Sequence, residues 1–209
     1  MAEDLKITTL LVDYGKVLRD TSWSAVVERV RPAKPGLDKQ KLYDAVFPQF
    51  KDYERGKYER LEFWSMVESA LGLEIPGTPG EFLSDCYRSV LLGYNSEVID
   101  VVANVHRQGL KTAIISNCCE EIADAIEESS RLVELFPIRI YSFKVGERKP
   151  HPHIFRAALQ AAAALPEECL FIDDQQKNIE GAEKLNINSI RYENPERLRL
   201  AISGSGLSV

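Results

Sequence analysis

The stretch LLVDYGKVL, residues 10–18, ends an apolar run on a carboxylate and then turns at once. Asp13 is the last residue of the run, and Tyr14 and Gly15 follow it directly. Aspartate is common in turns because its side chain accepts hydrogen bonds from nearby backbone N–H groups. A strand that ends on a charge is therefore explained either by a turn or by chemistry at the strand end, and the rest of the chain has to decide between them.

The composition is that of a globular protein. Of the 209 residues, 44% are hydrophobic and 28% are charged, and a chain of this length can form one domain, or one domain with a small insertion. The net charge is −6, from 26 Lys+Arg and 32 Asp+Glu. Because nucleic-acid binders neutralise phosphates with basic residues, this balance argues against a nucleic-acid partner.

Cysteine usage and the N-terminal stretch indicate a reducing, cytoplasmic compartment. The four cysteines show neither CxxC spacing nor a disulfide-like framework. The stretch MAEDLKITTLLVDYG is acidic and lacks the long apolar core of a signal peptide. No stretch approaches the roughly 18 consecutive apolar residues of a membrane helix, so we expect no membrane span.

Short apolar or β-branched runs, bounded by turn or cap residues, predict buried strands. These runs are ITTLLV (7–12), KTAIIS (111–116), IRIYSF (138–143), CLFI (169–172) and NSIRY (188–192). Helical patterns separate them, the clearest at residues 96–109, with Ser96 as the expected N-cap and Gly109 just past the end. Strands that alternate with helices predict an α/β fold, with a parallel sheet and helices on both faces.

Residues 19–92 interrupt this alternation with helical patterns and no strand. The segment lies between the first two predicted strands, so we expect a helical insertion at the edge of the sheet where ligands bind, which is a candidate lid. The stretch LEIPGTPGE, residues 73–81, predicts a loop inside this insertion.

Polar residues follow three of the predicted strands. Asp13 ends the first, Ser116 and Asn117 end the second, and the pair Asp173 and Asp174 ends the fourth. In parallel sheets, ligands bind at the carboxyl ends of the strands, where these side chains would meet. Carboxylates that converge there would repel one another unless a hard cation lay between them, and Mg²⁺ prefers oxygen ligands.

A cation enters separately as Lys149, in the stretch VGERKPHPHIF. A hydroxyl at Ser116 and an ammonium at Lys149 are the donors needed to hold phosphate oxygens while charge develops. Taken alone, Ser116 is explained as a helix N-cap and Lys149 as a solvated lysine. In this order and at these strand ends, however, the residues predict a phosphoryl site.

The chain resembles the haloacid dehalogenase superfamily, in the subfamily with a small helical cap. The stretches that carry the resemblance are LLVDYGKVL, TAIISN, GERKPHPHIFRAAL and CLFIDDQQKNIEGAEKLNINSI, in the order of that family's four motifs. The resemblance implies a Rossmann-like core, residues 1–18 and 93–209, and a four-helix cap, residues 19–92. It also implies a Mg²⁺-dependent phosphatase acting on a small phosphorylated metabolite, as a monomer or homodimer.

Roles for individual residues follow from the resemblance. Asp13 would be the nucleophile that forms an aspartyl-phosphate, while Ser116 and Lys149 would orient and neutralise the phosphoryl group. Asp174, together with Asp13 and the backbone carbonyl of Gly15, would hold Mg²⁺.

Further residues would support this centre. Asp173 is grouped with the metal site and, with Asn178, would hold the metal water and Lys149 in position. Asn117 would contribute through its backbone or its side-chain amide. Lys16 would either contact phosphate or extend into solvent.

Gly15 departs from the pattern, because most phosphatases of this family carry a second aspartate there as general acid and base. Three readings stay open. The chain is an enzyme for easier leaving groups, similar to the D-x-G sugar-1-phosphate phosphatases, or a slow enzyme, or a binding module. Gly15 itself either has lost a catalytic group or is needed for a positive φ or a close approach of substrate. A 2-haloacid dehalogenase is a weaker alternative, since that metal-free reaction has no use for the acidic pair.

Other residues are expected to be structural. Cys118 and Cys119 should pack, and Trp23 and Trp64 should belong to the core of the cap. His151 and His153 lack the neighbouring ligands of a zinc site.

Overall fold

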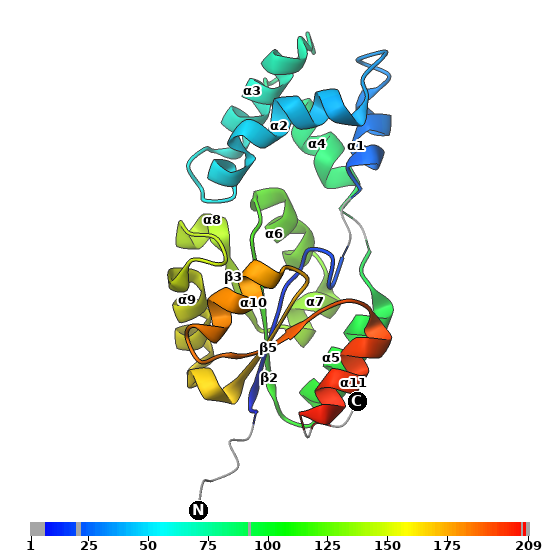
Figure 1. Ribbon diagram of the computed structural model, residues 1–209. Coiled ribbons are helices and arrows are strands. Elements are labelled where there is room, and N and C mark those ends of the chain that lie inside the picture. The colour runs from blue at the N-terminus through cyan, green and yellow to red at the C-terminus, as the bar shows by residue number, and fades with distance from the viewer. Residues whose placement is uncertain (1–6, 20–21, 92, 206, 208–209) are drawn as a thin grey trace, which may run out of the picture.

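The computed structural model describes residues 7–19, 22–91, 93–205 and 207. Its centre is a five-stranded parallel sheet in the order β3-β2-β1-β4-β5 (Figure 1). The strands are β1 (Thr9–Val12), β2 (Lys111–Ser116), β3 (Ile138–Tyr141), β4 (Cys169–Asp173) and β5 (Asn188–Arg191). All five coincide with predicted runs, and the predicted α/β Rossmann-like fold is confirmed.

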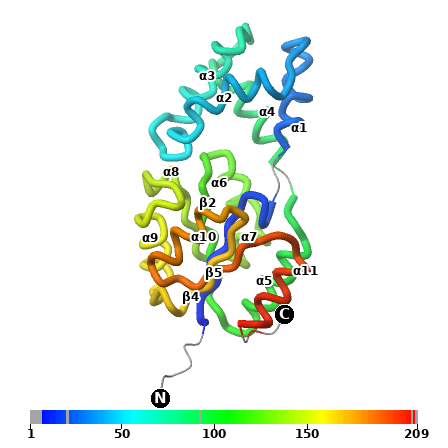
Figure 2. The backbone as a smooth tube through the Cα atoms, viewed as in Figure 1, coloured from blue at the N-terminus to red at the C-terminus, as the bar shows by residue number. Residues whose placement is uncertain are grey.

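Side chains alternate between the two faces of the sheet, and both faces are buried. Leu11 and Phe171 point to one face, which α9 (Pro152–Ala162) and α10 (Gln176–Glu183) cover. Val12 and Ile114 belong to the cluster on the other face. The helices on that side are α5 (Ser96–Arg107), α7 (Ser130–Leu135) and α11 (Pro195–Gly204), as Figure 2 shows for α5 and α11. This burial explains why the central strands β1 and β4 are mostly apolar, whereas the edge strands β3 and β5 are partly exposed and carry polar residues.

Two boundaries differ from the prediction. The N-cap of α5 is Asn95, not Ser96, and the Asn95 side chain accepts a hydrogen bond from the backbone of Val98. Asparagine and serine are equally good caps, so local sequence does not separate them. The run 138–143 is strand only to Tyr141, and α8 (Ser142–Val145) begins directly after it. Gly109, with φ +90°, follows the end of α5 as predicted.

The insertion folds into helices beyond the carboxyl edge of the sheet (Figure 1). They are α1 (Trp23–Val30), α2 (Lys39–Tyr53), α3 (Arg60–Leu71) and α4 (Glu81–Ser89), which pack on one another, and we call them the cap. The predicted loop 73–81 lies between α3 and α4, except that Glu81 already begins α4. The exact division into residues 1–18 with 93–209 and residues 19–92 stays a prediction. No helix in the described ranges is long and apolar enough to cross a membrane.

A buried carboxylate joins the cap to the rest of the molecule. Glu121 lies on α6 (Glu120–Glu127), below the cap, and is 0% exposed. Its Oε1 accepts hydrogen bonds from Trp64 Nε1 (2.5 Å) and Ser84 Oγ (3.0 Å), and its Oε2 accepts one from Tyr53 Oη (2.7 Å). These donors come from α2, α3 and α4, so one side chain fixes three cap helices.

A second contact joins the two chain segments that connect the cap to the core. The Arg19 guanidinium donates from Nη1 to the carbonyl oxygen of Gly93 (2.7 Å) and from Nη2 to that of Val90. The backbone N–H of Asn95 also donates to Leu18 O (2.6 Å). We call these contacts the Arg19 clasp, because they hold the entry and the exit of the cap side by side.

The Glu121 network predicts a large loss of stability in the variant Glu121→Leu. Three buried donors would lose their acceptor, so the free energy of unfolding should fall by about 2–3 kcal/mol. Urea unfolding measures this value. The matched variant Glu128→Leu removes an exposed carboxylate at the C-cap of α6 that pairs with Arg88 of α4 in an exposed ion pair, and it should change stability by less than about 0.5 kcal/mol. Equal losses in the two variants would contradict this account.

Candidate active site

Asp13 lies just after β1, and its contacts show why this strand ends on a charged residue. Its backbone N–H donates to Ile172 O (2.8 Å), which continues the pairing of β1 with β4. Its Oδ1 accepts hydrogen bonds from the backbone N–H of Tyr14 (2.7 Å) and from Lys149 Nζ (2.7 Å). The carboxylate therefore stabilises the turn and also takes part in a buried ion pair. Both hydrogen bonds described for this side chain go to Oδ1.

Lys149 is the centre of the site. It is 2% exposed, and its Nζ donates to Asp13 Oδ1, Asp173 Oδ2 and Ile115 O, each at 2.7 Å. Burial alone would lower the pKa of Lys149, but the two carboxylates outweigh burial and raise it. The reading of Lys149 as a solvated lysine is therefore wrong.

Asn117 fixes the backbone of Lys149. The Lys149 N–H donates to Asn117 Oδ1 (2.7 Å), and Asn117 Nδ2 donates to Lys149 O (3.0 Å). The amide of Asn117 is thus used to hold the loop. Ser116, by contrast, is buried and lies outside the lining of the cavity described below. The N-cap of α6 is Cys119, so the reading of Ser116 as an N-cap is wrong as well.

Asp173 is fully buried, and both of its oxygens accept hydrogen bonds. Oδ1 accepts from Gln175 N (2.8 Å) and Asn178 Nδ2 (2.9 Å). Oδ2 accepts from Lys149 Nζ (2.7 Å) and again from Asn178 Nδ2 (3.0 Å). Because both oxygens of Asp173 already accept hydrogen bonds, its contacts fit a residue that holds Lys149 in place better than a direct metal ligand. The sequence had grouped Asp173 with the metal site.

Asp174 has the opposite environment. Its side chain is 17% exposed, and its Oδ1 is buried with no hydrogen-bond partner among the described residues. Carboxylate oxygens of Asp13, Asp173 and Asp174 lie within 4.8 Å of one another. Lys149 is the buried cation beside these three carboxylates, and Lys16 lies 3.7 Å from Asp174 but is largely exposed, so the buried part of the site keeps excess negative charge that a divalent cation would neutralise.

The pKa shifts agree with an excess of negative charge. Burial raises the pKa of Asp13 to about 7, with Lys149 opposing the shift and Asp173 adding to it. Burial and the neighbouring Asp173 also raise the pKa of Asp174. The buried, unpartnered oxygen and the hard carboxylate ligands together fit a cation of the Mg²⁺ type.

Gly15 and Lys16 line the cavity, but only Lys16 has a left-handed backbone. The φ of Lys16 is +61°, whereas the φ of Gly15 lies outside the left-handed region. A Cβ at Gly15 would meet nothing within 4 Å. A requirement for positive φ at Gly15 is therefore wrong. The Lys16 side chain is 70% exposed, with Nζ 3.7 Å from Asp174 Oδ2.

A cavity of about 640 Å³ lies between the strand ends and the cap. Asp13, Lys149 and Asp174 line it from the core. The cap lines it with aromatic side chains, namely Trp23, Tyr43, Phe47, Phe50 and Tyr87. Trp23 is half-buried at the centre of this group, with its ring stacked on that of Tyr87 at 5.1 Å between centroids. The site thus has a charged floor and an aromatic wall.

The two tryptophans have different positions. Trp64 is fully buried, as expected of the cap core, whereas Trp23 faces the cavity. Cys118 and Cys119 are buried as predicted, and burial raises the pKa of both thiols. Tyr53 binds Glu121 and does not line the cavity.

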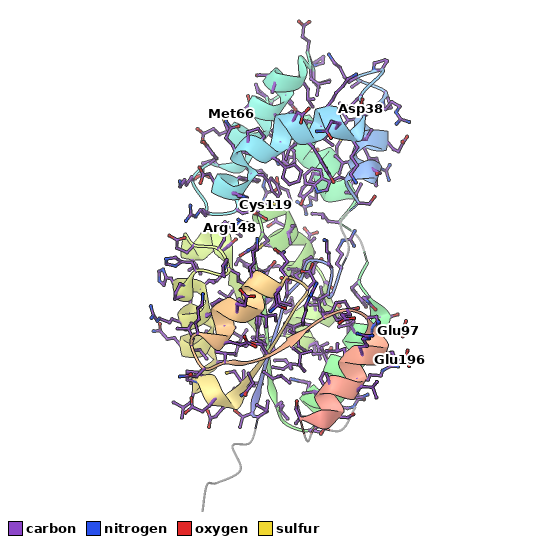
Figure 3. The ribbon with its side chains drawn as sticks, viewed as in Figure 1. Asp38, Met66, Glu97, Cys119, Arg148 and Glu196 are labelled. Atoms are coloured by element: carbon purple, nitrogen blue, oxygen red, sulfur yellow. The ribbon has the colours of Figure 1, made fainter. Side chains whose placement is uncertain are left out.

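Two residues that sequence reasoning missed also line the cavity. Glu54 follows α2, and its Oε2 lies 2.8 Å from Arg148 Nε in an ion pair. Figure 3 shows Arg148 at the edge of the core that faces the cap. One feature of the sequence could have pointed to Arg148, namely its position directly before Lys149. No such feature pointed to Glu54, because only the packing of the cap brings it to the site.

The chain is similar in sequence to known hydrolases. Residues 88–192 match the model of a family described as haloacid dehalogenase-like hydrolase. Pyrophosphatase PpaX of Bacillus cereus (strain AH820) is 30% identical over 179 residues, which are 86% of this chain and 80% of that protein. The chain belongs to the haloacid dehalogenase-like hydrolases. The predicted superfamily and its hydrolase class are confirmed, whereas the D-x-G subgroup stays a prediction.

Solved structures of this family share the fold. A family enzyme from Bacteroides thetaiotaomicron, in complex with magnesium and inorganic phosphate, superimposes with a TM-score of 0.73 at 23% identity, over 90% of this chain and 94% of that one. L-2-haloacid dehalogenase from Xanthobacter autotrophicus gives a TM-score of 0.63 at 23% identity, over 95% and 83%. The same fold thus holds magnesium and phosphate in one protein and carries a dehalogenase in another, so the fold alone does not decide the reaction.

The buried ion pairs predict a marked loss of stability in Lys149→Met. The variant leaves the carboxylates of Asp13 and Asp173 without their shared cation, and we expect the free energy of unfolding at pH 7 to fall by about 3–5 kcal/mol. Urea unfolding in metal-free buffer measures the loss. Lys177→Met, at an exposed position on α10, is the control and should change stability by less than about 0.5 kcal/mol. A loss for Lys149→Met as small as that of the control would show that the ion pairs do not stabilise the fold.

Proposed function

We propose that the protein is a Mg²⁺-dependent phosphomonoester hydrolase that acts through an aspartyl-phosphate on Asp13. One observation carries this proposal. The carboxylates of Asp13 and Asp174 and the ammonium of Lys149 converge on the floor of one cavity, at the carboxyl edge of the sheet. The names of its relatives, a pyrophosphatase and an enzyme solved with magnesium and phosphate, support it.

In this mechanism Asp13 attacks phosphorus, and the alcohol leaves on the opposite side. Lys149 holds Asp13 in place and neutralises charge on the phosphoryl oxygens. Asp174, Asp13 and the Gly15 carbonyl would hold Mg²⁺, which supplies further positive charge to those oxygens. Water then hydrolyses the aspartyl-phosphate and returns Asp13 to its starting form.

The metal site favours this reaction over dehalogenation. Attack on carbon by a single carboxylate needs no cation, yet Asp174 adds a partly buried carboxylate beside those of Asp13 and Asp173. The charge of this carboxylate is costly unless a metal uses it. Asp173 and Asn178 would keep Lys149 oriented, and Ser116 and Asn117 would support the phosphoryl pocket from the end of β2.

A small phosphorylated metabolite, with a sugar phosphate as the first candidate, suits the cavity. A volume of about 640 Å³ is in the ordinary range for small-molecule sites. The C–H faces of a sugar would pack on Trp23 and Phe50, while Lys39 and Arg148 would meet hydroxyl or phosphate oxygens. Lys16, exposed at the rim, would add positive charge. The cap would exclude water during phosphoryl transfer. A cytoplasmic location and a monomeric or homodimeric state belong to the same proposal.

The variant Asp13→Asn tests the nucleophile. The amide has the same volume but cannot attack phosphorus, so turnover should fall about 10³-fold or more while circular dichroism stays unchanged. The assay is a panel of sugar-1-phosphates, sugar-6-phosphates, nucleotides and pyrophosphate, with and without Mg²⁺. Asp100→Asn, at an exposed position on α5, is the control with full activity. Turnover near the wild-type rate in Asp13→Asn would exclude this role, and a wild type inactive on the whole panel would favour a binding module.

The variant Asp174→Asn tests the metal site through stability. At ten times its Kd, Mg²⁺ should stabilise the wild type by about 1.4 kcal/mol and raise Tm by roughly 3–5 °C. The variant should lose this response. In metal-free buffer its Tm should equal or slightly exceed the wild-type value, because repulsion between carboxylates is relieved. A clear fall in Tm without metal would mean that Asp174 is structural.

A further inference from the structure

We propose that Glu54, carried by the cap, protonates the oxygen of the leaving group and so replaces the acid that is absent at Gly15. The inference rests on the proposed phosphatase function. It concerns a residue outside the four motif stretches, on a segment more than thirty residues from Gly15 in sequence.

The position of the leaving group points to the cap. In phosphoryl transfer the attacking and leaving oxygens lie roughly in line, so the leaving oxygen faces away from Asp13. Asp13 lies on the floor of the cavity, and the cap forms the opposite wall. Gly15 offers no side chain. A proton donor for that oxygen must therefore come from the wall or the rim.

Among the described residues, three carboxyl groups line the cavity, those of Asp13, Glu54 and Asp174. Asp13 is the proposed nucleophile and Asp174 the proposed metal ligand. Glu54 is the carboxyl group of the three to which the proposed mechanism assigns no role. It is only 7% exposed, so its proton would be delivered inside the cavity and not to bulk water.

The backbone at Glu54 is held firmly against the core. Ser142 Oγ donates to Glu54 O (2.5 Å) and accepts a hydrogen bond from Cys118 N (2.9 Å), which places it between the cap and the end of β2. Two residues on, Gly56 has φ +71°, and a Cβ there would lie 2.4 Å from Phe143 O. Glycine thus allows the cap to approach α8 closely, and the approach brings Glu54 into the cavity.

Burial and the neighbouring charges together bring the pKa of Glu54 into the neutral range. Burial raises its pKa to about 7, while the Arg148 guanidinium opposes the shift and Asp13 adds to it. The other titratable groups that interact with it are Lys149, Tyr87 on α4 and the thiols of Cys118 and Cys119. A carboxyl group with a pKa in this range can both give and take a proton, as acid and base catalysis requires.

The proton balance closes over the two steps. As the Asp13 oxygen bonds to phosphorus and the bond from phosphorus to the leaving oxygen breaks, the Glu54 proton moves to that oxygen and releases the alcohol. The Glu54 carboxylate then accepts a proton from the water that attacks phosphorus. The bond between phosphorus and Asp13 breaks, phosphate leaves, and Glu54 is protonated again.

Glu54→Gln tests the proposal on phosphate monoesters whose leaving groups range from p-nitrophenol to simple alcohols. We expect kcat/KM to fall about 10²–10⁴-fold for alkyl esters and less than about 10-fold for p-nitrophenyl phosphate, which needs no proton donor. In the wild type, kcat/KM for alkyl esters should fall on the alkaline side of pH 7, where Asp13 is ionised and Glu54 loses its proton, and the variant should lack this alkaline limb.

Two further variants control the experiment. Glu147→Gln removes a carboxylate that pairs with Arg55 at 2.7 Å at the same border between cap and core, and it should leave the leaving-group dependence unchanged. Glu54→Asp keeps an acid on the cap and should retain the fall of activity above neutral pH, which separates loss of the proton from loss of folding.

The outcomes distinguish this proposal from the proposed function. If wild-type protein hydrolyses none of the esters with Mg²⁺, the phosphatase function fails and the inference with it. If the wild type is active but Glu54→Gln slows alkyl and aryl esters equally, the phosphatase function stands and the inference is overturned, because Glu54 would then act only through Arg148 or the shape of the cavity.

Discussion

The buried ammonium of Lys149 is the interaction on which the rest of the site depends. It satisfies carboxylates from two neighbouring strands and the carbonyl of a third, and so fixes the ends of β1, β2 and β4 relative to one another. A buried lysine is costly without partners, and buried carboxylates are costly without a cation. Asn117 and Asn178 complete the arrangement by holding the lysine's backbone and its anchor, Asp173. In this site the buried ammonium and the buried carboxylates therefore stabilise one another.

The sequence was sufficient for the core and its charged floor. Apolar or β-branched runs of 4 to 6 residues identified the strands, and parallel topology made their carboxyl ends meet, so Asp13 and Asp174 could be placed together without a structure. Lys149 follows no strand directly, and it was assigned to the same site from the order of the polar residues and from the family resemblance. Local sequence was less informative where two residues are equivalent, as at Asn95 and Ser96, or where only side-chain contacts distinguish a metal ligand from an anchor, as at Asp173.

The sequence predicted that the cap is helical, but it did not predict which cap residues face the cavity. Which of its residues face the cavity depends on how the helices rotate against the core, and Glu121 decides that rotation by binding donors from three of them. Tyr53 and Trp64 turn toward Glu121, so Trp23, Tyr43 and Phe50 are left to line the cavity. Glu54 enters the site for the same reason. Such residues are set by long-range packing, for which a single sequence carries no periodic signal.

The Arg19 clasp has a mechanical consequence. Because it binds Val90 and Gly93, it holds the two crossings between cap and core together, so they would act as one hinge in any opening that breaks the contacts of Glu121 and Ser142 with the cap. Glu54 and Trp23 both belong to the cap, so a rotation would carry the proton source and the substrate wall away from the nucleophile together. Opening of the cap would thus stop the reaction when water enters the cavity. Through Arg19, substrate binding by Trp23 and proton transfer by Glu54 would be gained and lost together.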